Sequence, residues 1–241
     1  MCKIRLSWVV GAALLFFAVP ALAVDGVVLI NQATVMSAGG FPYTITQPGS
    51  YRLSGNLTVP AGPDGIDINT DNVTLDLNGF TITGGGSGGN GVKTFNNNIT
   101  VKNGSVRNFT NDVIVQGTHE LVMDMHASIG SGGVPTGSNG IVVTGGVVVR
   151  CTAEAIAANT AFSVFNSTLI DSEVDTSNVF VTGISATNSA VLDNVLMLSG
   201  PVSTGIKNNG GSLIARNTVS VTGTPISGAS QGNNVCNGSA C

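Results

Sequence analysis

Residues 63–82 read PDGIDINTDNVTLDLNGFTI, and this stretch decides the fold. Apolar and polar residues alternate in IDIN, which begins at Ile66, and again in VTLDL, which begins at Val73. Alternation with a period of two predicts short β-strands with one buried face, and the Asp71-Asn72 pair between them is typical of a turn. The stretch opens on Gly65-Ile66, a glycine followed by an aliphatic residue, and this marker recurs along the chain.

The recurrence of the marker predicts the architecture. Clear copies begin at Gly91, Gly140, Gly183 and Gly205, and degenerate copies begin at Asp112, Ala161 and Pro225. The step from Ile66 to Val92 is 26 residues, and the step from Ile184 to Ile206 is 22 residues. A near-constant step of this size predicts an all-β solenoid, in which each repeat packs only against its neighbours.

Two neighbouring columns of residues suggest the register of the repeats. When the strands that follow each marker are aligned, one position is always charged: Asp76, Lys102, Asp124, Arg150, Asp171, Asp193 and Arg216. The preceding position is always apolar: Leu75, Val101, Met123, Val149, Ile170, Leu192 and Ala215. Because side chains alternate along a strand, we expect the apolar column to face the core and the charged column to face solvent. The signs of the charged column mostly alternate, which favours a structural ladder of ion pairs.

The chain divides into three regions. Residues 1–23 carry Lys3 and Arg5, an apolar run and a small-residue cleavage site at Ala21-Leu22-Ala23, which together predict a signal peptide and a secreted protein, extracellular or periplasmic. Residues 24–64 are predicted to form an N-terminal cap with irregular first rungs, because the end repeats of a solenoid must cover its core. Residues 65–241 are predicted to be parallel rungs with a short closing loop.

The cysteines fit that organisation. Secretion favours oxidation, so Cys236 and Cys241 are the candidates for a disulfide that closes the C-terminal loop. Cys151 lies within a strand pattern and is expected to be a small buried residue.

Composition excludes some partners. Charged residues are 9% of the chain and the formal net charge is −4. Nucleic acid requires a basic surface, so it is not an expected partner. No membrane span is expected after the signal peptide is removed, because no later apolar run is long enough.

The segment QPGSYRL from Gln47 to Leu53, together with residues 63–82, resembles the opening rungs of secreted bacterial proteins of the pectate-lyase-like superfamily. As architecture, the resemblance covers nearly all of the chain after residue 23. It implies a right-handed parallel β-helix of three parallel sheets. It does not imply a single function, since the superfamily includes lyases, hydrolases, epimerases and members without known activity.

Uronate lyases of this superfamily place acidic calcium ligands and a basic residue on an exposed sheet. The best candidates here for such a catalytic set are Lys102, Asp124, His126 and Arg150. A base, a cation and a carboxylate on one face suit proton abstraction next to a carboxylate. The alternative is an ion-paired ladder with a surface histidine beside it.

The evidence for other site types in the sequence is weaker. Asp67, Asn69 and Asp71 alternate on one strand and are calcium candidates, although three oxygens are too few for Ca²⁺. No other cofactor is expected. The paired Asp residues and His-Gly of the superfamily's hydrolases are not found, since His119 is followed by Glu120. Glycine-rich insertions at residues 84–89 and 130–137 lengthen two rungs at one corner, where they either border a binding face or are simply tolerated.

The leading functional hypothesis is a secreted, non-catalytic β-helix that binds extracellular or envelope polysaccharide or serves as a rigid surface scaffold. The first alternative is a polysaccharide lyase or epimerase that acts on uronate-containing glycans. The second is an adhesive protein that uses ladders of Thr and Asn. The sequence leaves the oligomeric state open.

Overall fold

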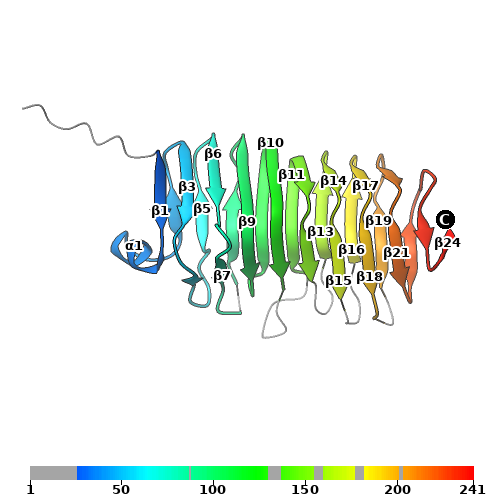
Figure 1. The fold of residues 1–241 in the computed structure, drawn as a ribbon, viewed down its shortest axis with the longest axis horizontal. Coiled ribbons are helices and arrows are strands. Elements are labelled where there is room, and N and C mark those ends of the chain that lie inside the picture. Colours follow the sequence, from blue (N-terminus) through cyan, green and yellow to red (C-terminus); the bar gives the residue numbers. More distant parts are fainter. Residues whose placement is uncertain (1–25, 87, 130–136, 155–159, 177–181, 201–202) are drawn as a thin grey trace, which may run out of the picture.

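The computed structural model describes residues 26–86, 88–129, 137–154, 160–176, 182–200 and 203–241. These residues form a parallel β-solenoid of about eight turns, seen side-on in Figure 1. The predicted all-β class and the solenoid are confirmed, whereas the handedness of the coil stays a prediction. The predicted signal peptide and most of the 130–137 insertion lie outside the described residues.

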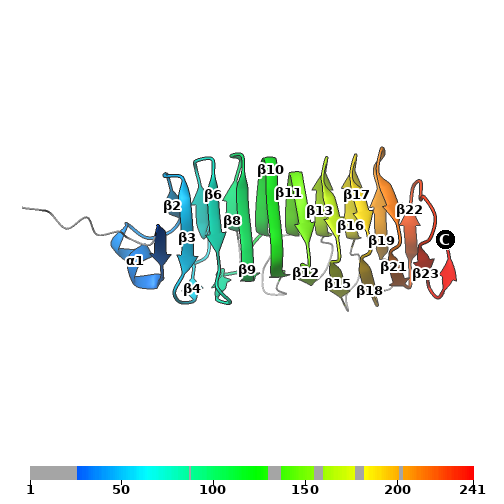
Figure 2. The same ribbon diagram turned by 45° about the horizontal axis from the view of Figure 1, so that its top comes forward.

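Three ladders of parallel strands, here called sheets 1, 2 and 3, run along the solenoid (Figure 2). Sheet 1 contains β2 (Tyr43–Ile45), β5 (Ile66–Ile68), β8 (Asn90–Thr94), the first parts of β10 (Asn111–Ser128) and β11 (Asn139–Val149), β13 (Thr160–Phe165), β16 (Thr182–Thr187), β19 (Thr204–Asn208) and β22 (Thr224–Ser227). Sheet 2 contains β1 (Val27–Ile30), β3 (Gly49–Leu53), β6 (Val73–Asp76), the first part of β9 (Ile99–Arg107), later parts of β10 and β11, β14 (Thr168–Ile170), β17 (Ala190–Leu192) and β20 (Leu213–Ala215). Sheet 3 contains β4 (Leu57–Thr58), β7 (Thr81–Thr83), the ends of β9 and β10, β12 (Thr152–Glu154), β15 (Glu173–Thr176), β18 (Val195–Leu198), β21 (Thr218–Val221) and β23 (Val235–Cys236).

Both ends of the solenoid are covered. At the N-terminal end, helix α1 (Gln32–Ser37) follows β1 and buries Val35 completely against the core. Asn31 caps this helix by accepting a hydrogen bond from the Thr34 N–H at 3.0 Å. Behind the helix, β2, β3 and β4 supply one strand to each sheet. At the C-terminal end, β24 (Ser239–Ala240) pairs antiparallel with β23, and a disulfide joins Cys236 to Cys241.

The glycine of the repeat marker allows successive turns to approach closely. A Cβ atom on Gly91 would lie 2.1 Å from Val106 Cγ1 and 2.5 Å from the Asp112 carbonyl oxygen. The next side chain of the marker points into the core, where Ile66, Val92 and Val113 stack in register and are fully buried. The marker therefore combines a close contact between turns with an anchor in the core.

The predicted register is wrong by one residue at a single step, between the second and third rungs, whereas the later rungs pair with one another as predicted. Leu75 pairs with Val101, and Asp76 pairs with Lys102, as predicted. In the third rung, however, Val122 pairs with Val101, so that Met123 rather than Asp124 stands beside Lys102. Val122 is fully buried, whereas Met123, Val149, Ile170 and Leu192 are partly exposed on the outer face of sheet 2.

The charged residues after Lys102 lie at the bend between sheets 2 and 3, which in the case of Asp124 falls within the long strand β10. Asn103, Asp124, Arg150, Asp171, Asp193 and Arg216 all have positive φ angles, between 49° and 62°. Left-handed backbone is unusual for residues other than glycine and is best tolerated by Asn and Asp. The predicted single column of charges is therefore two columns, one on sheet 2 and one at this bend.

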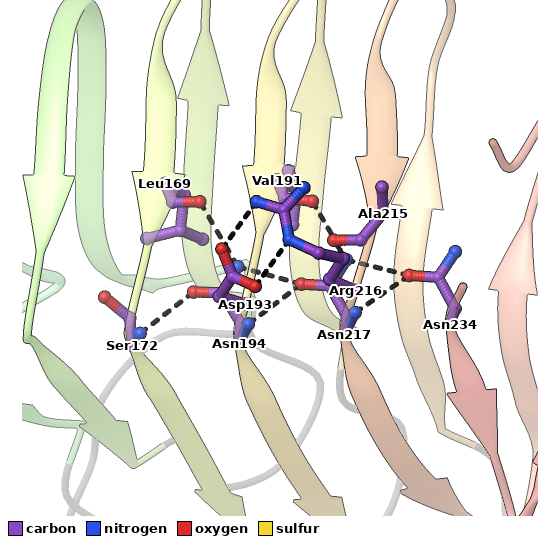
Figure 3. Close-up of polar contacts among 9 residues, drawn as sticks. All are labelled: Leu169, Ser172, Val191, Asp193, Asn194, Ala215, Arg216, Asn217 and Asn234. Atoms are coloured by element: carbon purple, nitrogen blue, oxygen red, sulfur yellow. Dashed lines mark hydrogen bonds and ion pairs between the residues drawn. The ribbon is translucent and has the colours of Figure 1, made fainter. Parts of the chain in front are cut away.

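A ladder of buried side chains lies directly behind the bend (Figure 3). The backbone N–H groups of Ser172, Asn194 and Asn217 each donate to the side-chain oxygen of the next asparagine along the axis, at 3.0 Å. These acceptors are Asn194, Asn217 and Asn234, which are all 1% exposed. Asn194 and Asn217 therefore have a structural role. Asn103 differs, since it is exposed and donates to Asp76.

A pair of adjacent substitutions tests which face of the strand is buried. We expect Leu75→Asp to lower the free energy of unfolding by several kcal/mol, because it places a charge in the core. Thr74→Asp, on the partly exposed opposite face, should change it by less than about 1 kcal/mol. Urea unfolding followed by circular dichroism measures both variants. Equal losses of stability would contradict the register.

Candidate functional site

Two open depressions adjoin each other along the bend between sheets 2 and 3. The first has a volume of about 390 Å³ and is lined by Gly104, Asp124, His126, Arg150 and Thr152, among others. The second has a volume of about 320 Å³, lies on the next two rungs, and is lined by Asp171, Ser172, Glu173, Asp193 and Val195. Together these depressions form a shallow polar surface, called here the trough.

Asp124 and Arg150 meet in the first depression. The Arg150 Nε and Nη2 atoms donate to the two carboxylate oxygens of Asp124 at 2.8 and 2.9 Å. The hydrogen bonds from Arg150 hold the pKa of Asp124 below its usual value, and the same contact raises the pKa of Arg150. Each charge thus neutralises the other, and Asp124 remains ionised at neutral pH.

His126 lines the same depression from sheet 3. It stands in register between Ser105 and Thr152, and its Nε2 atom lies 3.4 Å from Glu154 Oε1. Glu154 also accepts a hydrogen bond from Ser128 Oγ at 3.0 Å. Of the predicted catalytic set, the structure therefore brings Asp124, His126 and Arg150 together.

Lys102 lies apart from these three residues. It lines a different depression on sheet 2, with Arg52, Ser50 and Asp76 among its neighbours. The reason is the shift of register after the second rung, which leaves Lys102 on a strand and places Asp124 at the bend.

The calcium candidates do not converge on one point. Asp67 lies 3.5 Å from the Lys93 ammonium, which also contacts Asp64 and so occupies the position that a cation would take. Asp71 lies at a bend, where it accepts a hydrogen bond from the Asn97 N–H at 2.8 Å. Asn69 is exposed beyond the end of β5. Within the described ranges, no three His, Cys, Asp or Glu side chains are grouped to hold a metal ion.

Three acidic residues in or beside the trough, Glu154, Glu173 and Asp175, were not singled out from the sequence. Glu154 and Asp175 stand in register on the outer face of sheet 3, and Glu173 stands beside Thr152. Asp171, Glu173 and Asp175 form no ion pair with any lysine or arginine in the part of the chain that the structure describes. Extending the repeat alignment two residues past the charged column would have placed His126 and Glu173 on one face.

Two further carboxyl groups are buried elsewhere in the third rung. Asp112 occupies the glycine position of the marker, is fully buried, and has a pKa raised well above its usual value by that burial. Glu120 is 2% exposed, and one of its oxygens accepts a hydrogen bond from the Ile99 N–H at 3.1 Å. Burial raises the pKa of Glu120 to about 7, with a smaller contribution from the charge of Asp71.

The buried thiol is not a candidate for chemistry. Cys151 is 1% exposed and free, and burial raises its pKa to about 12. Its predicted role as a small buried residue is confirmed. No helix in the described ranges is long and apolar enough to cross a bilayer.

Comparison with known proteins gives no family for this chain. No family model, curated protein or solved structure matches it significantly.

The ionisation of Glu120 predicts a pH dependence of stability. Its folded-state pKa of about 7 lies above the value of 4.5 for a free glutamate, so the protonated side chain stabilises the fold below pH 4.5. This stabilisation is lost progressively as the pH rises to about 7. Between pH 5 and pH 8 we expect the free energy of unfolding to fall by roughly 2 kcal/mol more in the wild type than in Glu120→Gln. Parallel pH profiles of the two proteins in urea unfolding would refute the assignment.

Proposed function

We propose that this protein is a secreted, non-catalytic β-solenoid that binds extracellular or envelope polysaccharide along the trough. Secretion rests on the signal-peptide features of residues 1–23. The superfamily resemblance is part of the same proposal and agrees with the observed solenoid. The observation that carries the proposal is the adjacency of two shallow depressions on one bend.

The shape of the trough suits a polymer better than a small molecule. The two depressions span successive rungs, and each rung advances by about 4.8 Å along the axis. Small-molecule sites are usually enclosed and mostly apolar, whereas this surface is open and offers serine, threonine, carboxylate and guanidinium groups. A linear chain lying along the axis would meet at least one charged side chain on each of the rungs from Asp124 to Asp193.

The charges of the trough suit binding better than proton transfer. A general base works best with a pKa near the working pH, whereas Arg150 lowers the pKa of Asp124. Arg150 is engaged by both of its hydrogen bonds to Asp124, and Arg216 is engaged in the same way by Asp193. Side chains fixed by such pairs are preorganised to donate hydrogen bonds to sugar hydroxyls and to accept hydrogen bonds from them.

Affinity electrophoresis in gels that contain single polysaccharides, neutral or uronate-rich, tests the proposal. We expect at least one polysaccharide to retard the wild type. The double variant His126→Ala/Arg150→Ala should bind about tenfold more weakly, because it removes one wall of the first depression. The matched control is Lys207→Ala, since Lys207 is an exposed cation on sheet 1, away from the trough.

Two results would contradict the proposal. One is the absence of retardation by every polysaccharide tested; the other is equal retardation of the wild type and the double variant. Release of unsaturated uronate products, lost in His126→Ala, would instead favour the lyase alternative. That alternative is retained only because Asp124, His126 and Arg150 share one depression.

A further inference from the structure

The outer face of sheet 2 changes character along the solenoid. The end strand β1 presents the apolar Val27 and Leu29 on this face. The outward positions of the next three strands, β3, β6 and β9, are polar or charged: Ser50, Arg52, Thr74, Asp76, Thr100 and Lys102. In the next five rungs they are almost all apolar: Leu121, Met123, Val147, Val149, Thr168, Ile170, Ala190, Leu192, Leu213 and Ala215. This set of ten residues is called here the apolar face.

The strands beneath this face are apolar on both sides. Val148, Leu169 and Val191 point inward and are fully buried, while their neighbours on both sides point outward. The strand segments consequently read LVM, VVV, TLI, AVL and LIA. Near-continuous apolar strands are typical of sheets that are covered on both faces, whereas a sheet that faces water on one side alternates.

Nothing in the described part of the chain covers the apolar face. Its one helix lies at the N-terminal end, and sheet 2 runs uncovered along the side of the solenoid (Figure 1). Val147, on the second of the five rungs, is 38% exposed, and Leu213, on the last, is 44% exposed. Five rungs of three-residue strands extend over roughly 24 by 10 Å. Contiguous exposed apolar patches that are bordered by polar residues are often interaction sites.

We propose that the apolar face binds the apolar face of a second copy of this chain, related by a two-fold axis. The axis runs parallel to the strands and passes through the rung of Ile170, which is the middle rung of the five. The two sheets would then pack face to face with their solenoid axes antiparallel. Such a contact is closed, because each copy uses the same surface.

The charges along the edge of the face match this arrangement. The bend column beside the five apolar rungs reads Asp124, Arg150, Asp171, Asp193 and Arg216, with signs −, +, −, −, +. A two-fold axis at the middle rung reverses the order in the second copy. Asp124 then faces Arg216 of the second copy, and Arg150 faces its Asp193. In both pairs the two charges are opposite in sign. The column is therefore electrostatically complementary to the same column of the second copy, which runs in the reverse order.

Only the middle position brings like charges together, because Asp171 faces its own equivalent across the axis. The Arg150 of the same chain, one rung away, interacts electrostatically with Asp171. The existing Asp124–Arg150 and Asp193–Arg216 pairs would join across the interface into two groups of four charges.

A second copy fits this face better than a lipid surface does. Binding to anionic lipid requires free basic side chains beside the apolar surface, whereas both arginines at this edge are paired with aspartates. The dimer also leaves the two troughs on the same edge of the assembly, because the axis is parallel to the strands.

Sedimentation velocity over roughly a hundredfold range of protein concentration tests the proposal. We expect the wild type to sediment as a dimer, and Ile170→Glu and Leu192→Glu to sediment as monomers. The matched control is Ser163→Glu, on the outer face of sheet 1, which should remain a dimer. Circular dichroism verifies that each variant keeps its β-sheet content, so that loss of the dimer is not loss of the fold.

The orientation has its own test. Arg150→Asp should weaken the dimer at least tenfold, because it opposes Asp193 of the second copy, whereas Asp171→Asn should strengthen it by removing the like-charged pair. A wild type that stays monomeric at the highest concentration would overturn the proposal, as would a dimer unaffected by Ile170→Glu. Flotation of a monomeric wild type with phosphatidylcholine vesicles would assign the face to lipid instead.

Discussion

The structure depends on one repeated interaction, the hydrogen bond that a bend N–H donates to a side chain of the next turn. At the left-handed bend between sheets 2 and 3, the chain leaves one strand ladder before it joins the next. The N–H that follows the bend would be buried without a partner, at a cost of about 1–3 kcal/mol each. Side-chain oxygens of the next turn accept hydrogen bonds from these N–H groups along the axis (Figure 3); the acceptors are Ser172, Asn194, Asn217 and Asn234. At the bend between sheets 1 and 2, backbone N–H groups donate in the same way to serine hydroxyls of the next turn, those of Ser167, Ser189 and Ser212.

These ladders determine where the functional surfaces lie. Because the residue after the bend points inward, the left-handed residue before it points outward, and Asp124, Arg150, Asp171, Asp193 and Arg216 form an outer column. The same column borders the trough on one side and the apolar face on the other. A single backbone constraint therefore places the proposed polysaccharide surface and the proposed dimer surface side by side.

The sequence predicts the solenoid well because each turn repeats a steric requirement, the glycine contact, next to a buried aliphatic residue. It does not predict which residue of LVM or VVV faces inward, since both faces are apolar there and alternation carries no signal. In the structure Val122 pairs with Val101 and is buried, so the inward-facing residue of LVM is one position before the predicted Met123. Because of the same ambiguity, the sequence alignment places Lys102 and Asp124 in one column, whereas in the structure Lys102 pairs with Met123. Conversely, the apolar column that the sequence assigns to the core includes Val149, Ile170 and Leu192, which point outward and belong to the apolar face.

The most direct test of the central interaction is amide hydrogen exchange of Asn217→Ala, measured residue by residue by NMR. The substitution removes the oxygen that accepts from the Asn194 N–H, as well as donors to the carbonyls of Val191 and Ala215. The account predicts that the Asn194 amide is protected in the wild type and loses its protection in the variant, while amides in the distant β5 keep theirs. Unchanged protection of the Asn194 amide would contradict the claim that side-chain ladders hold the bends in register.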